Sequence, residues 1–255
     1  MINIKEIKEN AYSLSLAHTR DNIEKTIKNA ETKNLTYTEF INNVFKEELK
    51  YRVDKAKEKR IKEAGFPYIK RIEDFDVGFQ HSITEKQLKQ LSELKWIEQM
   101  YNLIFLGPPG VGKSHISIAL AYKAAEEGYK VSFTTMSSLI QILRTNEIST
   151  RSKVKLNRIY KSSLVVIDEV GYLPIERTDA NLFFQLISDL YEQSSIIITS
   201  NKGFEEWAEF LGDAALTTAI LDRLTFKCDM ISLEGKSYRL EHRSSYLDGN
   251  EDSQI

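Results

Sequence analysis

The chain has 255 residues, of which 42% are apolar and 28% charged, and its net charge is −2. These values are ordinary for a soluble globular protein, and the length allows one well-buried α/β domain with a smaller appendage. The balanced charge gives no sign of a nucleic-acid partner, so any DNA contact would have to come from a local basic patch. Cys228 is the only cysteine, which excludes an internal disulfide and fits a reducing compartment. The start of the chain is too charged for a secretory signal, and no apolar run reaches the roughly 20 residues that span a bilayer, so we expect a cytoplasmic protein with no membrane partner.

The first part of the chain, residues 1–70, is expected to form a small all-helical domain. Apolar residues recur there at helical spacing, first at Ile23 and Ile27 and again from Phe40 to Leu49. Residues 71–100 are predicted to form an extended linker followed by a lead-in helix at about 84–98. The polar, acidic tail at 244–255 is predicted to be disordered.

Residues 101–243 alternate between short apolar runs and helical stretches. This alternation is typical of an α/β fold in which helices cover both faces of a parallel sheet. The expected strands are Asn102–Leu106, Val131–Thr134, Leu164–Ile167, Ile196–Thr199 and Met230–Leu233. The clearest helices between them are Ser114–Glu127 and Asp179–Tyr191.

A complete P-loop motif, GPPGVGKS, follows the first of these strands and precedes a helix, which is the context that the motif requires. Its glycines let backbone N–H groups curve around phosphate oxygens, and the helix adds the positive end of its dipole. Lys113 is expected to bridge the β- and γ-phosphates of ATP, and Ser114 to offer its hydroxyl to Mg²⁺. The predicted ATP-binding residues of this segment are Gly107, Pro108, Pro109, Gly110, Val111, Gly112, Lys113, Ser114 and His115.

Polar side chains follow two later strands, at the edge where ligands bind in open α/β sheets. Asp168 is predicted to hold Mg²⁺, directly or through water, and Glu169 to polarise the water that attacks the γ-phosphate. Asn201 is predicted to reach between the γ-phosphate and that water. Such residues also end many strands without any catalytic role, but the upstream P-loop favours the catalytic interpretation.

Two segments also fit GTPase motifs. Residues 168–171 match Asp-x-x-Gly, and residues 201–203 begin the guanine-binding Asn-Lys-x-Asp. Phe204 occupies the fourth position of that second motif, so no carboxylate is available for guanine. The extra strand before Asp168 also suits an ATPase. A P-loop small-molecule kinase is a further alternative, but no acceptor pocket or lid arginines are evident in the sequence.

Two arginines late in the chain are candidates for contact with ATP. Arg223 lies on an expected helix with no obvious route to its own P-loop, which suggests an arginine finger that reaches the γ-phosphate of a neighbouring subunit. Arg239 follows the last strand and is expected to face the nucleotide of its own chain. For both, the alternative is a surface arginine in an ion pair.

The motifs together resemble the IstB-type insertion-sequence ATP-binding proteins, which are AAA+ transposition helpers related to the DnaC-type helicase loaders. The resemblance rests on the P-loop and on Asp168–Tyr172, Thr199–Asn201 and Asp222–Leu224, and upstream segments such as Phe66-Pro67 and Asp74–Asp76 favour IstB. It implies an AAA+ core without a C-terminal helical lid and ATP hydrolysis during transposition. It also implies homo-oligomeric assembly on double-stranded DNA and delivery of target DNA to the transposase of the same element. A replicative helicase loader is the alternative. Ser114 stands where many relatives have threonine and supplies the same hydroxyl.

A basic helix is the candidate DNA contact within the helical domain. The basic stripe, as we call it, recurs at three- and four-residue spacing, so its members can share one helix face. Such a stripe suits phosphate contacts, although a solvated helix face is the alternative. The stripe comprises Arg52, Lys55, Lys59 and Lys62. Further basic residues that could line a DNA path are Arg144, Arg151, Lys153, Lys155 and Arg158.

Overall fold

The computed structural model describes residues 3–172 and 174–243, and it divides the chain between Lys59 and Arg60 into two compact units. The segment predicted as a helical domain, 1–70, contains the first unit and the start of the second. The tail predicted to be disordered, 244–255, lies outside the described residues. Among the described helices, none is long and apolar enough to cross a membrane.

The first unit is helical. It consists of α1 (Ile4–Ser13), α2 (Ala17–Thr32) and most of α3 (Tyr37–Ala64). A buried carboxylate joins two of these helices, because Glu48 accepts hydrogen bonds from the backbone N and the hydroxyl of Thr19, at 2.9 and 3.0 Å. Burial raises the pKa of Glu48, but these bonds and the bond from Arg52 outweigh it, so the pKa is lowered overall.

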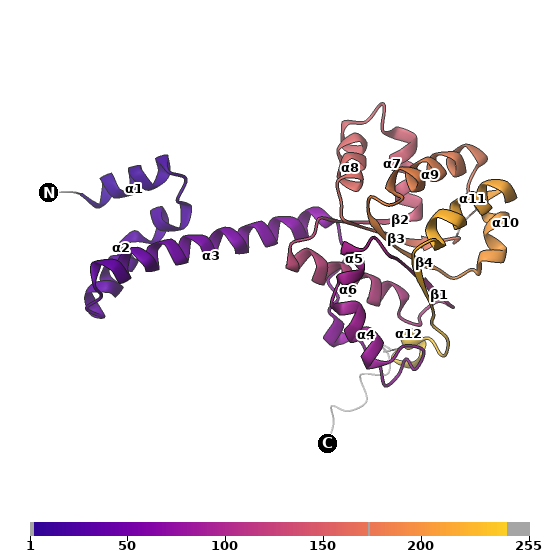
Figure 1. The fold of residues 1–255 in the computed structure, drawn as a ribbon, viewed down its shortest axis with the longest axis horizontal. Coiled ribbons are helices and arrows are strands. Elements are labelled where there is room, and N and C mark those ends of the chain that lie inside the picture. The colour runs from indigo at the N-terminus through magenta and orange to yellow at the C-terminus, as the bar shows by residue number, and fades with distance from the viewer. Residues whose placement is uncertain (1–2, 173, 244–255) are drawn as a thin grey trace, which may run out of the picture. The chain divides into compact units, whose positions relative to one another are not determined.

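The second unit is built on a parallel sheet of five strands, in the order β2-β3-β4-β1-β5 (Figure 1). The strands are β1 (Asn102–Leu106), β2 (Val131–Thr135), β3 (Leu164–Val170), β4 (Ser195–Ser200) and β5 (Cys228–Ser232). Four of them begin and end within one residue of the predicted ranges or extend them at the carboxyl end, and β5 begins two residues early. The predicted fold class, an α/β parallel sheet with an all-helical segment before it, is confirmed.

Helices cover both faces of this sheet, as Figure 1 shows. Side chains alternate across each strand, so Leu103 and Phe105 pack on one face and Ile104 on the other. The first face is covered by α4 (Glu85–Ser92), α5 (Lys95–Glu98) and α6 (Lys113–Glu127). The second is covered by α7 (Met136–Thr145), α8 (Thr150–Tyr160), α9 (Arg177–Leu190), α10 (Trp207–Leu211) and α11 (Ala214–Thr225). The remaining short elements are η1 (Ile72–Asp74), η2 (Phe204–Glu206) and α12 (Tyr238–Glu241).

The segment before β1 is more broken than the sequence indicates. A 3₁₀ turn, η1, interrupts the stretch expected to be extended, where the side chain of Asp74 accepts a hydrogen bond from the backbone N of Arg71 at 3.3 Å. The single expected lead-in helix is two helices, α4 and α5, because Leu94 between them adopts a left-handed conformation with φ of 60°. The segment thereby folds back along α6 and toward the P-loop.

Candidate nucleotide-binding site

The P-loop connects the carboxyl end of β1 to the amino end of α6, as predicted. Gly112 precedes the first residue of α6 with φ of 102°, and Gly110 has φ of 88°, both in the region that favours glycine. Space is restricted here as well. A Cβ on Gly110 would lie 2.0 Å from Oγ of Ser237, and one on Gly112 would lie 2.7 Å from the ring of Phe75. The glycines are therefore needed both for the loop conformation and for the close packing of two other segments against the loop.

The C-terminal segment packs directly on the P-loop. The backbone N of Tyr238 donates to the carbonyl of Gly110 at 3.0 Å, which fixes α12 beside the loop. Burial lowers the pKa of Lys113, against the opposing effect of Asp168, and the positive charge of Arg239 on α12 lowers it further. Arg239 thus lies close to the P-loop of its own chain.

The linker before β1 forms another wall of the loop. The buried side chain of Gln80 donates to the carbonyls of Val111, at 2.9 Å, and Glu234, at 3.1 Å. It therefore ties the linker, the P-loop and the C-terminal segment together. His115 lies 3.2 Å from the carbonyl of Arg71, and burial lowers the pKa of its imidazole. The sequence contains no motif that singles out Gln80, so only the fold could reveal this role.

Ser114 and Asp168 are brought into contact at the base of the loop. The hydroxyl of Ser114 donates to Oδ1 of Asp168 at 2.8 Å, and the hydroxyl of Thr199 donates to the same oxygen. The backbone N of Glu169 in turn donates to Oγ1 of Thr199 at 3.0 Å. Thr199 is thus the link between β3 and β4 at this edge, and sequence reasoning assigned it no role. The sequence feature that could have identified Thr199 is a hydroxyl residue at the end of a buried strand, one position before a serine and two before Asn201.

This oxygen-rich arrangement fits Mg²⁺. A hydroxyl and a carboxylate at hydrogen-bond distance are ligands of the kind that Mg²⁺ takes in proteins, where phosphates and waters complete its octahedron. No group of three or more His, Cys, Asp or Glu residues that could hold a metal occurs in the described parts of the chain. Such a group is not required when phosphate oxygens supply ligands.

Lys113 lies along the P-loop rather than in solvent. Its Nζ donates to the carbonyls of Gly107, at 2.6 Å, and Pro108, at 2.8 Å. These contacts hold the ammonium of Lys113 in the concave side of the loop.

Glu169 and Asn201 occupy neighbouring strand ends. Glu169 is exposed and has φ of 63°, in the left-handed region that costs a non-glycine residue about 1–2 kcal/mol. The ladder between β3 and β4 shifts register between Ile167 and Val170, so the strand bulges at the two carboxylates. The bulge turns Asp168 toward the P-loop and leaves Glu169 accessible to solvent. Asn201 is the first residue after β4 and is also exposed.

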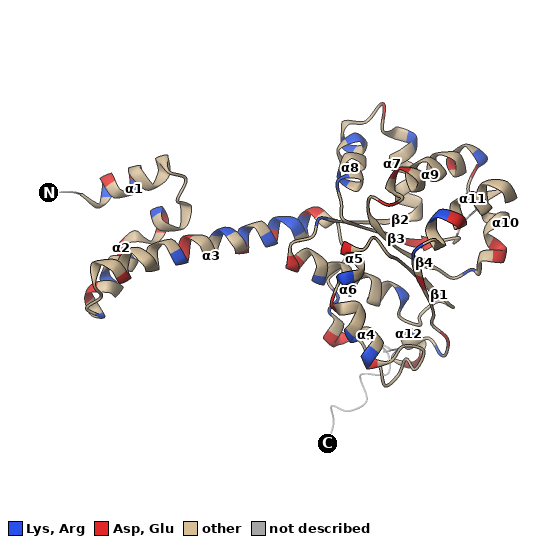
Figure 2. Cartoon of the chain, in the orientation of Figure 1, with Lys and Arg blue, Asp and Glu red and all other residues tan. Residues whose placement is uncertain are grey.

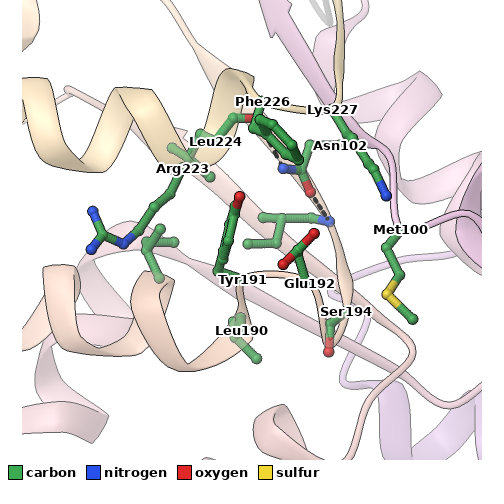
Figure 3. A pocket seen from close by; sticks show the side chains of 12 residues that line it. Met100, Asn102, Leu190, Tyr191, Glu192, Ser194, Arg223, Leu224, Phe226 and Lys227 are labelled. Atoms are coloured by element: carbon green, nitrogen blue, oxygen red, sulfur yellow. Dashed lines mark hydrogen bonds between the residues drawn. The ribbon is translucent and has the colours of Figure 1, made fainter.

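Arg223 lies at the opposite edge of the sheet. It lines a small cavity together with Asn102, the first residue of β1, and Ile196, near the start of β4 (Figure 3). This edge holds the amino ends of the strands, whereas the P-loop follows their carboxyl ends. The guanidinium lies 4.8 Å from the ring centre of Phe184 and donates to the carbonyl of Ala219 at 2.8 Å. Arg223 and the P-loop of its own chain therefore lie at opposite ends of the strands.

The predicted DNA contacts have different surroundings. Within the basic stripe, Arg52 bonds to Glu48 and to the carbonyl of Ser15, and Lys55 pairs with Glu58 at 2.8 Å. Lys59 and Lys62 are exposed on α3. Figure 2 shows Lys and Arg gathered toward the C-terminal end of this helix.

The second basic group lies on α7 and α8. Arg144 is held by the buried carboxylate of Asp179 on α9, so its charge stabilises the packing of two helices. Arg158 donates to the carbonyl of Glu63 at 2.9 Å. The members of this group that are exposed on α8 are Arg151, Lys153 and Lys155.

A P-loop after the first strand, a carboxylate pair near the end of the third and the strand order of this sheet define a nucleotide-binding protein of the AAA+ class. Comparison with known proteins gives the particular group: the chain belongs to the family described as IstB-like ATP binding protein, which it matches over residues 9–246.

Relatives from insertion sequences align along most of this chain. One is named as the putative ATP-binding protein of insertion sequence IS21 from Pseudomonas aeruginosa, with 40% identity over 90% of this chain and 87% of its own length. Another, from Bacteroides fragilis, is named as an IS21-like ATP-binding protein, with 36% identity over 94% of this chain and 92% of its own.

Solved structures share the fold. A crystal structure of DnaI superposes with a TM-score of 0.54 at 18% identity and covers 64% of this chain and 90% of its own. DnaA from Aquifex aeolicus, solved with AMPPCP bound, gives a TM-score of 0.51 at 19% identity over 66% of this chain and 51% of its own.

Proposed function

We propose that this protein is an ATP-hydrolysing, DNA-binding helper of a transposase, which assembles on double-stranded target DNA during insertion-sequence transposition. The observation that carries the proposal is the joining of Ser114, Asp168, Thr199 and Glu169 at the edge of a complete P-loop. The family supplies the biological setting, because the two relatives described above are named as ATP-binding proteins of insertion sequences.

The residues of the loop suggest how ATP binds. The backbone N–H groups of the P-loop and the amino end of α6 favour the phosphates, and Lys113 lies where its ammonium can pair with them. Bound Mg²⁺, held by Ser114 and Asp168, would neutralise phosphate charge. The fold brings Arg239 to this loop, where a second positive charge would favour the same phosphates.

Hydrolysis is assigned to Glu169, with Asn201 beside it. Glu169 is exposed next to the buried Asp168, so its carboxylate is free to orient and polarise a water molecule for attack on the γ-phosphate. The bulge in β3 separates the two carboxylates into a ligand that faces the loop and a base that faces solvent. Asn201 would hydrogen bond to the same water or to the γ-phosphate.

Arg223 is assigned to the site of a neighbouring subunit. The sheet separates it from its own P-loop, while an arginine that acts in trans can raise the rate of hydrolysis by about 10³-fold or more. This assignment requires a homo-oligomer, and it would make turnover depend on assembly.

DNA contact is assigned to the exposed cations of α3 and α8. Arg52, Lys55 and Arg144 are already paired with carboxylates of this chain. Lys59 and Lys62 of the basic stripe and the three residues of α8 are exposed and available to pair with phosphates. Contacts of this kind act mainly through counterion release and give little sequence preference.

A helicase loader is the second candidate, because the fold of the second unit is shared with DnaI. The two candidates differ in the partner that they bind. ATP turnover should be measured with and without double-stranded DNA, and the purified protein should be tested for capture of the transposase encoded beside it and, separately, of the replicative helicase. Stimulation by DNA with capture of the transposase supports our proposal. Capture of the helicase alone would replace it with the loader.

A further inference from the structure

A phenylalanine on α9 holds the side chain of Arg223, which lies on α11. The guanidinium carbon of Arg223 is 4.8 Å from the ring centre of Phe184, within the roughly 6 Å at which an aromatic ring attracts a cation. The guanidinium also donates to the carbonyl of Ala219, one turn earlier on α11, at 2.8 Å. Both Arg223 and Phe184 are partly buried. The guanidinium is therefore held by an aromatic ring and by the backbone of its own helix.

The fold holds another arginine, Arg144, in a different way. The buried carboxylate of Asp179 accepts two hydrogen bonds from the guanidinium of Arg144, and an oxygen of Glu176 lies 3.5 Å away. These carboxylates neutralise its charge. In the part of the chain that the structure describes, Arg223 pairs with no carboxylate, and a ring attracts a cation without cancelling its charge. Arg223 is therefore held in place but still carries the charge that a phosphate requires.

The ring of Phe184 is itself anchored in the core. Its neighbour on α9, Phe183, is fully buried, and Phe184 packs against the same hydrophobic cluster on the second face of the sheet. The aromatic residue that follows α9, Tyr191, has another partner, because its ring lies 5.9 Å from that of Phe226 (Figure 3). The ring beside Arg223 is thus held by the core, and it can hold the guanidinium in turn.

A held guanidinium matters because arginine has many rotamers. An arginine that reaches a phosphate bound by another subunit must give up this freedom when it makes the contact. A contact that restricts the rotamers beforehand raises the fraction of time for which the guanidinium is in position. Such a contact acts on the rate of the chemical step rather than on the affinity of either subunit for ATP.

We propose that Phe184 is a positioning residue for ATP hydrolysis, whose ring holds the guanidinium of Arg223 in position for the γ-phosphate bound by a neighbouring subunit. The proposal rests on the proposed function, in which Arg223 acts in trans, and it adds the residue on which the placement of Arg223 depends. Without the ring, Arg223 would still be present but more mobile. Loss of the ring should therefore slow turnover less than loss of Arg223 itself.

The first test compares substitutions of the ring in the full-length protein with double-stranded DNA present. Phe184→Leu keeps an apolar side chain and removes the ring. We expect its maximal turnover to fall by about 5- to 30-fold, which is about 1–2 kcal/mol at about 1.36 kcal/mol for each factor of ten, with KM for ATP unchanged. Phe184→Met, a second apolar replacement, should behave in the same way. Phe184→Tyr keeps the ring and should turn over at nearly the wild-type rate.

The matched control is Phe226→Leu, which removes a ring that packs on Tyr191 and should retain turnover. Urea unfolding and sedimentation of every variant would show that folding and assembly are intact. Wild-type turnover in both Phe184→Leu and Phe184→Met would overturn the proposal. A rise in turnover would also overturn it, because the ring would then hold Arg223 in a resting position. So would an equal fall in Phe184→Tyr, because packing and not the ring would then be responsible.

The second test asks whether Phe184 acts through Arg223. Arg223→Ala and the double variant Arg223→Ala/Phe184→Leu should have the same low turnover, because the ring has no guanidinium left to hold. A further fall in the double variant, as large as that of Phe184→Leu alone, would overturn the proposal. Loss of turnover in Arg223→Ala with none in Phe184→Leu would overturn this proposal alone. Wild-type turnover in Arg223→Ala would overturn the trans assignment of Arg223 as well.

The third test asks in which subunit Phe184 acts. A Lys113→Ala subunit has a defective P-loop but an intact Arg223 and Phe184. Its addition in excess should raise turnover per Phe184→Leu subunit toward the wild-type value, because the neighbour then supplies the held arginine. The same excess of Lys113→Ala/Arg223→Ala supplies no arginine and should give no rise. Equal effects of the two additions would show that Phe184 acts within its own subunit and would overturn the proposal.

Discussion

Replacement of Gly110 by alanine should show how tightly the C-terminal segment is packed on the P-loop. Alanine at φ of 88° carries a conformational cost of about 1–2 kcal/mol. The added Cβ would also lie 2.0 Å from Oγ and 2.7 Å from Cβ of Ser237, and overpacking of this kind costs about 1–3 kcal/mol. We therefore expect Gly110→Ala to lower the free energy of unfolding by about 2–5 kcal/mol and to weaken ATP binding, because the loop and α12 cannot both keep their positions.

The overpacking part of this cost should be recoverable. Ser237→Gly removes both atoms that clash and leaves Cα of residue 237 at 3.2 Å, and Ser237 makes no side-chain bond at the start of α12. In a double-mutant cycle measured by urea unfolding, with ATP affinity measured by calorimetry, Ser237→Gly should restore about 1–3 kcal/mol to Gly110→Ala. Additive effects of the two changes, or a Gly110→Ala protein as stable as the wild type, would refute the close packing on which this reasoning depends.

Three further predictions concern other parts of the chain. Arg223→Ala should retain ATP affinity but lose turnover by a factor on the order of 10³. Mixing it with Lys113→Ala should partly restore turnover. No recovery at any ratio in co-assembled protein would argue against a nucleotide site shared between subunits. Glu48→Gln should lower the free energy of unfolding at neutral pH by about 1–3 kcal/mol, because it weakens buried hydrogen bonds. Because folding lowers the pKa of Glu48, its carboxylate stabilises the fold above the unfolded pKa, and this contribution disappears as the pH falls through the folded pKa. The difference in unfolding free energy between Glu48→Gln and the wild type should therefore shrink on acidification. A difference that stays constant with pH would contradict this prediction. Neutralising the three lysines of the basic stripe should weaken the salt dependence of DNA binding and leave ATP affinity unchanged. The slope of log affinity against log salt should fall by about one unit for each DNA phosphate that is no longer neutralised. An unchanged slope in filter binding would show that this helix does not contact DNA.

The second unit could be predicted closely from the sequence because its signals are local. The strands β1, β3 and β4 are short, largely buried runs rich in leucine, isoleucine and valine, and the P-loop motif specifies its own strand–loop–helix context. Asp168 could be placed near Ser114 because the carboxyl ends of parallel strands meet at one edge of a sheet. These inferences need only periodicity and motif spacing.

The remaining features depend on contacts between distant parts of the chain. Gln80 and Ser237 pack on the P-loop from segments about 30 residues before it and about 125 residues after it, and nothing in their local sequence indicates this. The exposed apolar side chains of α3 show the opposite failure. Helical spacing of Ile41, Phe45 and Leu49 identifies a helix face, but it cannot distinguish a face buried in the same chain from one left exposed.

The central claim, that this site binds and hydrolyses ATP, is tested most directly by Glu169→Gln. The substitution keeps the size of the side chain and removes the base, while Ser114, Asp168 and Lys113 keep their positions around the P-loop. ATP affinity by calorimetry and phosphate release should be measured on the same preparation, in the presence of double-stranded DNA. We predict wild-type ATP affinity with phosphate release reduced by a factor on the order of 10² or more. Phosphate release at the wild-type rate would contradict the assignment of Glu169, and loss of ATP binding would contradict the separation of binding from hydrolysis in this site.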